Sequence, residues 1–138
     1  MSNPMMILLA DDDPVQTLLL TTRLKQVGYK VETATNAVQA WMAAISRPPD
    51  AIILDIQMPG GTGYAVLKQM KSSSKTKRVP VIILSGSTDS ADTTKLKELG
   101  ADEYFSKPVD IAQLIATLSK LLRPPVRTPG RMAVEDVT

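Results

Sequence analysis

The sequence predicts an α/β domain built on an open parallel sheet, and three features of the chain carry that prediction. Short apolar runs alternate with longer segments of helical periodicity, as in repeated strand–helix units. Runs such as Ile-Leu-Leu-Ala and Val-Ile-Ile-Leu are apolar on both faces, which is typical of strands covered by helices on both sides. The runs are too few to close a barrel, so we expect a doubly wound sheet.

The expected strands coincide with the apolar runs. They lie at residues 5–10, 30–34, 51–55, 79–85 and 103–106. We expect the flavodoxin-like strand order 2-1-3-4-5, which is an order known from this fold class rather than one that periodicity reveals. Ligands of such sheets bind beyond the carboxyl ends of the strands, so function is expected there.

Capping residues mark the expected helices. Asp13-Pro14 indicates the start of the first helix and Gly28 its end. Asn36 caps a second helix, which Pro48-Pro49 stops. The remaining helices are expected at about residues 63–73, at about 87–99 before Gly100, and from Asp110 onward.

Composition narrows the class of protein. The 138 residues suit one domain, and 43% hydrophobic residues supply a core. The net charge of +2 does not indicate the basic patch that direct nucleic-acid binding requires. The absence of cysteine and histidine excludes disulfides, Cys/His zinc sites and imidazole catalysis. Without a membrane span or signal peptide, we expect a cytoplasmic protein with its domain at residues 1–122 and a flexible tail or linker at 123–138.

Polar residues stand where four of the expected strands end. Asp11-Asp12-Asp13 follows the first strand, Asp55 ends the third, Ser85-Gly86 ends the fourth and Lys107-Pro108 follows the fifth. In the expected fold these ends lie side by side. Three carboxylates in one crevice repel one another unless a cation compensates, and Mg²⁺ prefers such oxygen ligands. With Mg²⁺ and Lys107 beside it, Asp55 can attack a phosphoryl group, whose oxygens Ser85 and Lys107 would bind.

Each of these residues also has a structural explanation. Asp13 is best explained as a helix cap, but one cap does not need Asp11 and Asp12 as well. Asp55 and Lys107 can form a buried ion pair, and Ser85 can cap the next helix. Four separate structural roles at adjacent strand ends are a less simple explanation than one functional site that uses all four residues.

The chain resembles the receiver domain of two-component response regulators over roughly residues 5–122. The matching stretches are Ile-Leu-Leu-Ala-Asp-Asp-Asp-Pro, Ile-Leu-Asp-Ile-Gln-Met-Pro, Val-Ile-Ile-Leu-Ser-Gly and Tyr-Phe-Ser-Lys-Pro. Each motif alone is weakly specific, whereas the ordered set is highly specific.

The resemblance implies a role for each matching residue. Asp55 is the phosphoacceptor, and Lys107 and Ser85 assist it. Asp12 binds Mg²⁺ directly, with Mn²⁺ as an alternative ion, while Asp11 acts through water and Gln57 through its backbone carbonyl. Ser85 and Tyr104 form the switch, and the Lys107–Pro108 peptide is cis. The donor of the phosphoryl group is a histidine kinase or a histidine phosphotransfer protein. An output partner binds the surface formed by the fourth helix, the fifth strand and the fifth helix. Homodimerisation on phosphorylation is one possible outcome.

The chain departs from the family pattern at two places. Gly60-Gly61-Thr62-Gly63 replaces the usual Met-Asp-Gly continuation, and Gly86 follows Ser85 where alanine is common. We expect both changes to loosen their loops without removing a reacting group.

Three other functions remain alternatives. A Mg²⁺-dependent aspartyl-phosphate phosphatase usually has a second Asp where this chain has Gln57. A flavin or nucleotide carrier would have Gly, Ser or Thr amides after the first strand instead of acids. A scaffold would bind partners without phosphorylation.

Overall fold

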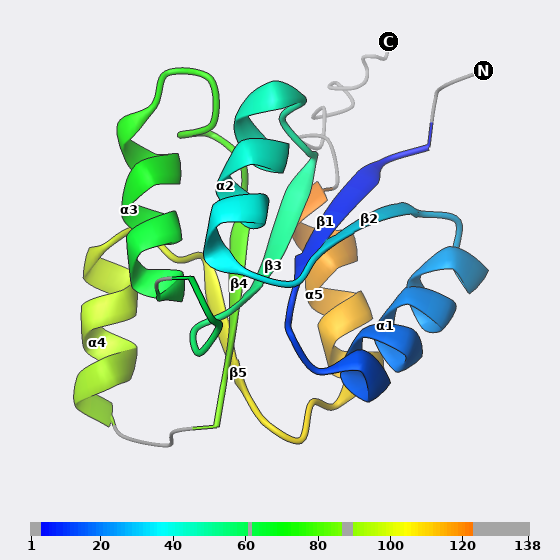
Figure 1. Cartoon of the computed structure of the whole chain (residues 1–138). Helices are drawn as coiled ribbons and strands as arrows, with labels where there is room; N and C mark the ends of the chain where they lie inside the picture. The colour runs from blue at the N-terminus through cyan, green and yellow to red at the C-terminus, as the bar shows by residue number, and fades with distance from the viewer. Residues whose placement is uncertain (1–3, 61, 87–89, 123–138) are drawn as a thin grey trace, which may run out of the picture.

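The computed structural model describes residues 4–60, 62–86 and 90–122 (Figure 1). The elements in chain order are β1 (Met6–Ala10), α1 (Pro14–Gln26), β2 (Lys30–Ala34), α2 (Ala37–Ser46), β3 (Ala51–Asp55), α3 (Gly63–Ser72), β4 (Val81–Ser85), α4 (Ser90–Glu98), β5 (Glu103–Ser106) and α5 (Ile111–Leu122). The strands form a parallel five-stranded sheet in the order β2-β1-β3-β4-β5, which confirms the predicted topology. None of the helices described is long and apolar enough to cross a membrane.

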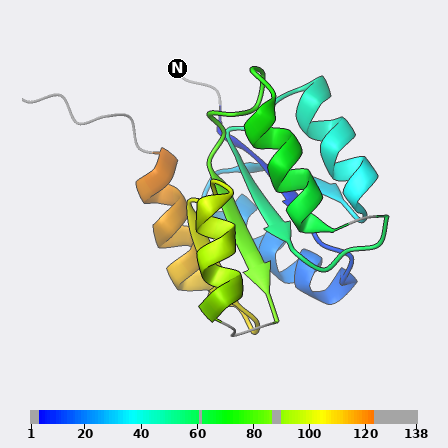
Figure 2. The ribbon, with the colours of Figure 1, turned by 90° about the vertical axis from the view of Figure 1, so that its left-hand side faces the viewer.

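Two apolar cores hold the helices against the sheet. The alternation of side chains along β1 sends Ile7 and Leu9 to one face and Leu8 and Ala10 to the other. Helices α1 and α5 cover the first face, and α2, α3 and α4 cover the second (Figures 1 and 2). Because both faces are covered, the central strands β3 and β4 are buried along their whole length.

The predicted caps are present. The Asp13 carboxylate accepts hydrogen bonds from the backbone N–H groups of Val15 and Gln16, and Asn36 accepts one from Gln39 at 2.8 Å. Gly28 adopts a left-handed φ of 103° after α1. These contacts satisfy N–H groups that the first turn of a helix leaves without partners.

Some predicted boundaries were wrong by one or two residues. β4 begins at Val81 rather than at residue 79, because the Val79 N–H still closes a turn on the Thr76 carbonyl at 3.0 Å. Asp110 is the cap of α5 rather than its first residue, and its carboxylate accepts from the Gln113 N–H at 3.1 Å. The predicted start of the fourth helix at 87–89 and the tail at 123–138 lie outside the described residues.

Acidic side chains also hydrogen-bond to backbone N–H groups at the edge of the sheet where the strands begin. Asp50 accepts from the Met6 N–H at 2.7 Å, and Asp102 accepts from the Val81 N–H at 2.8 Å. Each carboxylate therefore satisfies the first N–H of a neighbouring strand. Lys71 reaches the same edge, where its ammonium donates to the Val79 carbonyl at 3.1 Å and lies 3.8 Å from Asp102.

A glycine joins α3 to the end of β3 by direct backbone packing. A Cβ atom on Gly63 would lie 2.6 Å from the Ile56 Cα atom and 2.7 Å from the Asp55 carbonyl oxygen. The Gly63 N–H donates to the Ile56 carbonyl at 2.9 Å. The first turn of α3 is thus held against the backbone of the site strand, at a distance that only glycine permits.

Replacing Gly63 by alanine tests this packing. We expect Gly63→Ala to lower the free energy of unfolding by about 1–3 kcal/mol, because the backbone contact outweighs the better helix propensity of alanine. Gly86→Ala is the matched control, since nothing lies within 4 Å of its added Cβ atom. Urea unfolding measures both variants, and equal stability of the two would contradict the packing argument.

Candidate phosphoacceptor and metal site

The strand register brings the predicted site residues to one edge of the sheet. Ala10 pairs with Leu54, Asp55 with Leu84, and Ser85 with Ser106. Asp11 and Lys107 each follow one of these paired positions directly. The Lys107 N–H donates to the Ser85 carbonyl at 2.8 Å, and the Lys107–Pro108 peptide is cis, as the family resemblance implied.

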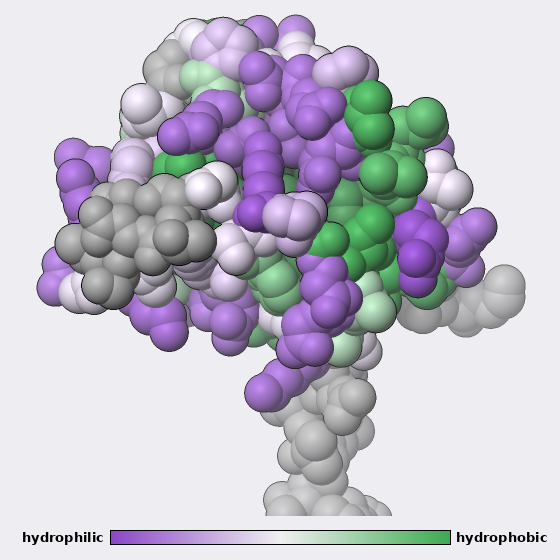
Figure 3. All heavy atoms as spheres, turned by 90° about the horizontal axis from the view of Figure 1, so that it is seen from below, coloured by the Kyte–Doolittle hydropathy of each residue, from purple (hydrophilic) through white to green (hydrophobic). Residues whose placement is uncertain are grey.

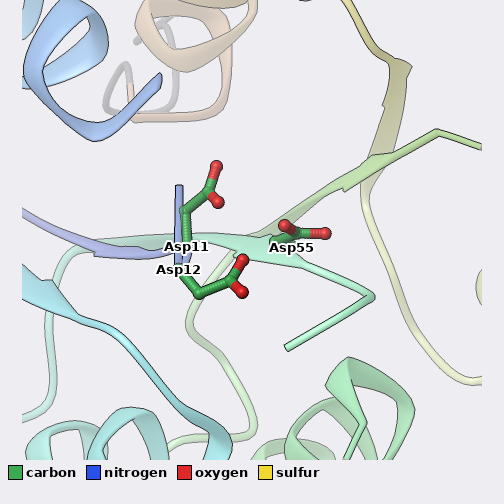
Figure 4. Close-up of side chains that lie close together, drawn as sticks. All are labelled: Asp11, Asp12 and Asp55. Atoms are coloured by element: carbon green, nitrogen blue, oxygen red, sulfur yellow. The ribbon is translucent and has the colours of Figure 1, made fainter. Parts of the chain in front are cut away.

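Three carboxylates converge at this edge (Figure 4). One oxygen from each of Asp11, Asp12 and Asp55 lies within 4.8 Å of the others. Asp11 is 1% exposed and Asp55 2% exposed, whereas Asp12 is exposed to solvent. The group therefore joins two buried acids to one that faces water. Asp13 takes no part in this group, because its side chain caps α1.

The two buried acids are held by different partners. Asp55 accepts from the Gln57 N–H at 2.9 Å through Oδ1 and from the Lys107 ammonium at 2.7 Å through Oδ2. Asp11 accepts from the Asp13 N–H at 3.0 Å through Oδ1. In the part of the chain that the structure describes, Asp11 Oδ2 has no hydrogen-bond partner, and Lys107 lies 3.9 Å away. Asp11 Oδ2 is therefore a buried oxygen that can still accept a hydrogen bond or bind a cation.

The local electrostatics favour an added cation. Burial is the main cause that raises the pKa of Asp11 to about 6 overall; the charge of Asp55 adds to this rise, and the Asp13 N–H and Lys107 oppose it. Burial lowers the pKa of Lys107, but the hydrogen bond to Asp55 and the surrounding carboxylates outweigh it, so that the pKa lies above its usual value. Lys107 is therefore a fixed positive charge that compensates Asp55 more fully than Asp11.

The three acids fit a hard divalent ion. The oxygen-only donor set, the unpartnered buried Asp11 Oδ2 and the solvent-facing Asp12 match the preference of Mg²⁺ for carboxylates together with several waters. The side chain of Gln57 is exposed, and its backbone is bound to Asp55, which places this residue beside the acids.

The predicted switch residues lie on adjacent strands. Ser85 is 3% exposed at the end of β4. Tyr104 pairs in register with Ile83 one strand away and is half-buried. Tyr104 also lines a hollow between β5 and α5. The structure thus places the hydroxyl at the acid site and the aromatic ring toward the surface of β5 and α5.

A cavity of about 550 Å³ opens beside the acids, and Tyr64 is the part of its wall that the sequence did not lead us to expect. Its lining residues are Asp12, Ile56, Gln57, Met58, Pro59, Thr62, Tyr64 and Ser85. The signal for Tyr64 was present, because it is one of three tyrosines and directly follows the glycine next to the site loop. Whether the Tyr64 side chain points into the cavity, however, depends on how Gly63 packs against β3, which the sequence does not reveal.

Thr62 explains how the chain accommodates its departure from the family pattern. Its hydroxyl accepts from the Ala65 N–H at 3.3 Å and so caps α3, a task that an acid would also perform. The Pro59 carbonyl accepts from the Ala37 N–H at 3.0 Å. These described parts of the loop are anchored at both ends, whereas Gly61 lies outside the described residues.

Removing one buried charge tests the electrostatics. We expect Asp11→Asn to raise Tm by a few degrees at pH 7.5 in EDTA, because it relieves repulsion and the burial of a charge. Added Mg²⁺ should raise the Tm of the parent chain but not that of Asp11→Asn. Asp13→Asn is the control, since asparagine caps a helix equally well and the metal response should persist. An unchanged Mg²⁺ response in Asp11→Asn would remove Asp11 from the cation site.

Known proteins are similar in sequence to this chain over most of its length. The profile of the response regulator receiver domain family matches residues 7–119. Protein PilH of Pseudomonas aeruginosa is 34% identical over 116 residues, which cover 84% of this chain and 96% of PilH. The DNA-binding dual master transcriptional regulator RpaA of Synechocystis is 32% identical over 123 residues, which cover 89% of this chain but 51% of RpaA. The chain spans about half the length of RpaA and of several other curated relatives.

Solved structures agree with this relationship. The chemotaxis response regulator CheY4 of Vibrio cholerae superposes with a TM-score of 0.81 at 29% identity, covering 86% of this chain and 99% of CheY4. The receiver domain of the sensor histidine kinase PA1611 from Pseudomonas aeruginosa, solved with a magnesium ion in its active site cleft, gives a TM-score of 0.79 at 28% identity over 86% of this chain and 98% of that domain. With the profile match, these likenesses show that the chain belongs to the receiver domain family of two-component response regulators.

Proposed function

We propose that this chain is a phosphorylation switch in which Asp55 accepts a phosphoryl group from a phosphohistidine donor. The observation that carries the proposal is the setting of Asp55. Its carboxylate is buried, is bound to Lys107 at 2.7 Å, and lies beside the acids Asp11 and Asp12. An ordinary structural ion pair does not need two further acids whose charges oppose it.

The residues divide the chemistry among them. An oxygen of Asp55 attacks phosphorus in line, the O–P bond forms, and the bond from phosphorus to the donor nitrogen breaks, leaving its electron pair on the imidazole. Lys107 neutralises a phosphoryl oxygen and the Ser85 hydroxyl donates to another. Asp12 would hold Mg²⁺ directly, Asp11 through water, and Asp55 and the Gln57 carbonyl would complete the set. The ion, or Mn²⁺ in its place, supplies charge neutralisation on the phosphoryl oxygens.

The switch follows from the same contacts. A phosphoryl group adds about 1.5–2 negative charges and three acceptor oxygens at Asp55. Movement of Ser85 toward these oxygens would leave space for Tyr104 and bias the surface of α4, β5 and α5 toward a second arrangement. An output partner, or a second copy of the chain, would bind that surface.

Mass spectrometry tests the central step. We expect incubation with acetyl phosphate and Mg²⁺ to add one phosphoryl group of about 80 Da to the parent chain and none to Asp55→Asn, because only Asp55 has the activating partners. Asp50→Asn is a matched control, since Asp50 precedes β3 whereas Asp55 ends it, and it should still be labelled.

The same experiment separates the alternatives. An adduct on Asp55→Asn would refute the phosphoacceptor assignment. Sustained turnover of small phosphate esters would favour the phosphatase, although Gln57 stands where that class has its second Asp. A scaffold would keep its partner binding after Asp55→Asn.

The surface beside the acids supports a protein donor. These 138 residues contain no histidine, so the phosphohistidine would lie outside them. Val15, Leu18 and Leu19 of α1 are 65%, 67% and 51% exposed. Leu18 also lines a hollow that includes Asp11 and Asp12. Figure 3 shows an apolar area on the α1 side of this edge next to hydrophilic residues near its centre. A donor that covers this area would bring its histidine to Asp55.

Changing Leu18 distinguishes docking from chemistry. We expect Leu18→Glu to slow labelling by a phosphohistidine phosphotransfer protein that labels the parent chain, by about tenfold or more, because a charge is then buried at the interface. Labelling by acetyl phosphate, which needs no docking surface, should be unchanged. Equal slowing with both donors would point to damage at the site instead.

The remaining assignments follow the family. We propose a cytoplasmic regulator with its domain at residues 1–122 and a tail or linker at 123–138. Two relatives that are named as transcriptional regulators, one of them as DNA-binding, are about twice as long as the stretch matched here. We therefore propose that this domain controls its output through a partner or an attached domain and does not itself bind nucleic acid.

A further inference from the structure

Tyr64 is fixed to the backbone of the site strand. It follows Gly63, which packs on Asp55 and Ile56 too closely to admit a Cβ atom. Tyr64 also lines the cavity of about 550 Å³ that contains Asp12 and Ser85. Tyr64 is therefore one residue away from a direct backbone contact with Asp55.

The ring of Tyr64 binds a cation on another helix. The ammonium of Lys95, on α4, lies 4.9 Å from the ring centroid, which is the distance of a cation–π interaction. Among the described side chains of α4, Leu96 is buried in the core and Leu99 follows the helix as a half-buried contact. The helix has a polar sequence, Ser-Ala-Asp-Thr-Thr-Lys-Leu-Lys-Glu. The Tyr64 ring thus adds a link between α3 and α4 to the apolar contacts of Leu96 and Leu99.

The Tyr64–Lys95 contact is present together with a direct bond between Lys107 and Asp55. The Lys107 ammonium lies 2.7 Å from Asp55 Oδ2, a position that a phosphoryl group on that oxygen would occupy. We propose that Tyr64 is a positioning residue, whose ring holds Lys95 and thereby keeps α4 in the unphosphorylated arrangement. This inference rests on the proposed switch, and it adds a link through α3 that does not involve Tyr104.

Linkage gives the proposal a measurable consequence. A contact that is made in only one of two arrangements opposes any ligand that favours the other. Removing it must therefore tighten the binding of a phosphoryl mimic without any change at the acids. An exposed cation–π interaction accounts for about a two- to fivefold change in such an equilibrium.

Calorimetric titration of beryllofluoride at saturating Mg²⁺ measures this effect. We expect Lys95→Gln, which changes no residue that lines the cavity, to bind the mimic about two- to fivefold more tightly. Tyr64→Leu should show the same gain, whereas Tyr64→Phe and Lys95→Arg, which keep the ring and the cation, should resemble the parent. In the free protein, Lys95→Gln should also speed amide exchange at residues 93–99.

The double variant separates a link from a local effect. If the gain runs through the contact, Tyr64→Leu adds nothing in the Lys95→Gln background. A gain from Tyr64→Leu that persists there, or unchanged affinity in Lys95→Gln, would overturn the inference while the proposed function stands. A parent chain that binds beryllofluoride no better than Asp55→Asn would instead overturn the proposed function, and the inference with it. Thermal unfolding of each variant shows that it is folded.

Discussion

The burial of two carboxylates at one edge of a parallel sheet is the constraint on which the rest of the site depends. Asp11 and Asp55 lie where the ends of β1 and β3 meet, almost wholly out of water. Their repulsion is only partly offset by Lys107, which contacts Asp55 at 2.7 Å and Asp11 at 3.9 Å. The imbalance leaves a place for an additional positive charge, and the exposed Asp12 opens that place to solvent.

The elements around the site differ in how firmly they are held: α3 packs directly on the backbone of β3, whereas α4 has a more polar sequence. Toward β3, glycine packing and the capping hydroxyl of Thr62 hold the loop and α3 in place. Toward α4, the contacts include the buried Leu96, the half-buried Leu99 and the Lys95 ammonium over the Tyr64 ring. An element that has few apolar contacts opens at low free-energy cost, whereas the strands beneath it do not. In the proposed switch, α4 is therefore the helix that a change of charge at Asp55 would displace most easily.

Much of this arrangement could be predicted from the sequence, because its causes are local or periodic. The acids after β1, Asp55 and Lys107 were brought together by the strand register, as the order 2-1-3-4-5 requires. The caps Asp13 and Asn36 were predictable from residue type alone. The contact of Tyr64 with Lys95 was not, because it depends on how α3 and α4 pack. Nor was the role of Lys71, which donates to two backbone carbonyls near the opposite edge of the sheet, because these bonds depend on how the chain after α3 returns to β4.

The carboxylates of Asp50 and Asp102 have a further consequence for how such a domain can evolve. They accept the first N–H groups of β1 and β4, so the pairing of these strands is secured at the edge opposite the site. Replacing the acids at positions 11, 12 and 55 would leave these two bonds in place. A descendant that can no longer be phosphorylated would therefore keep this edge of its sheet paired.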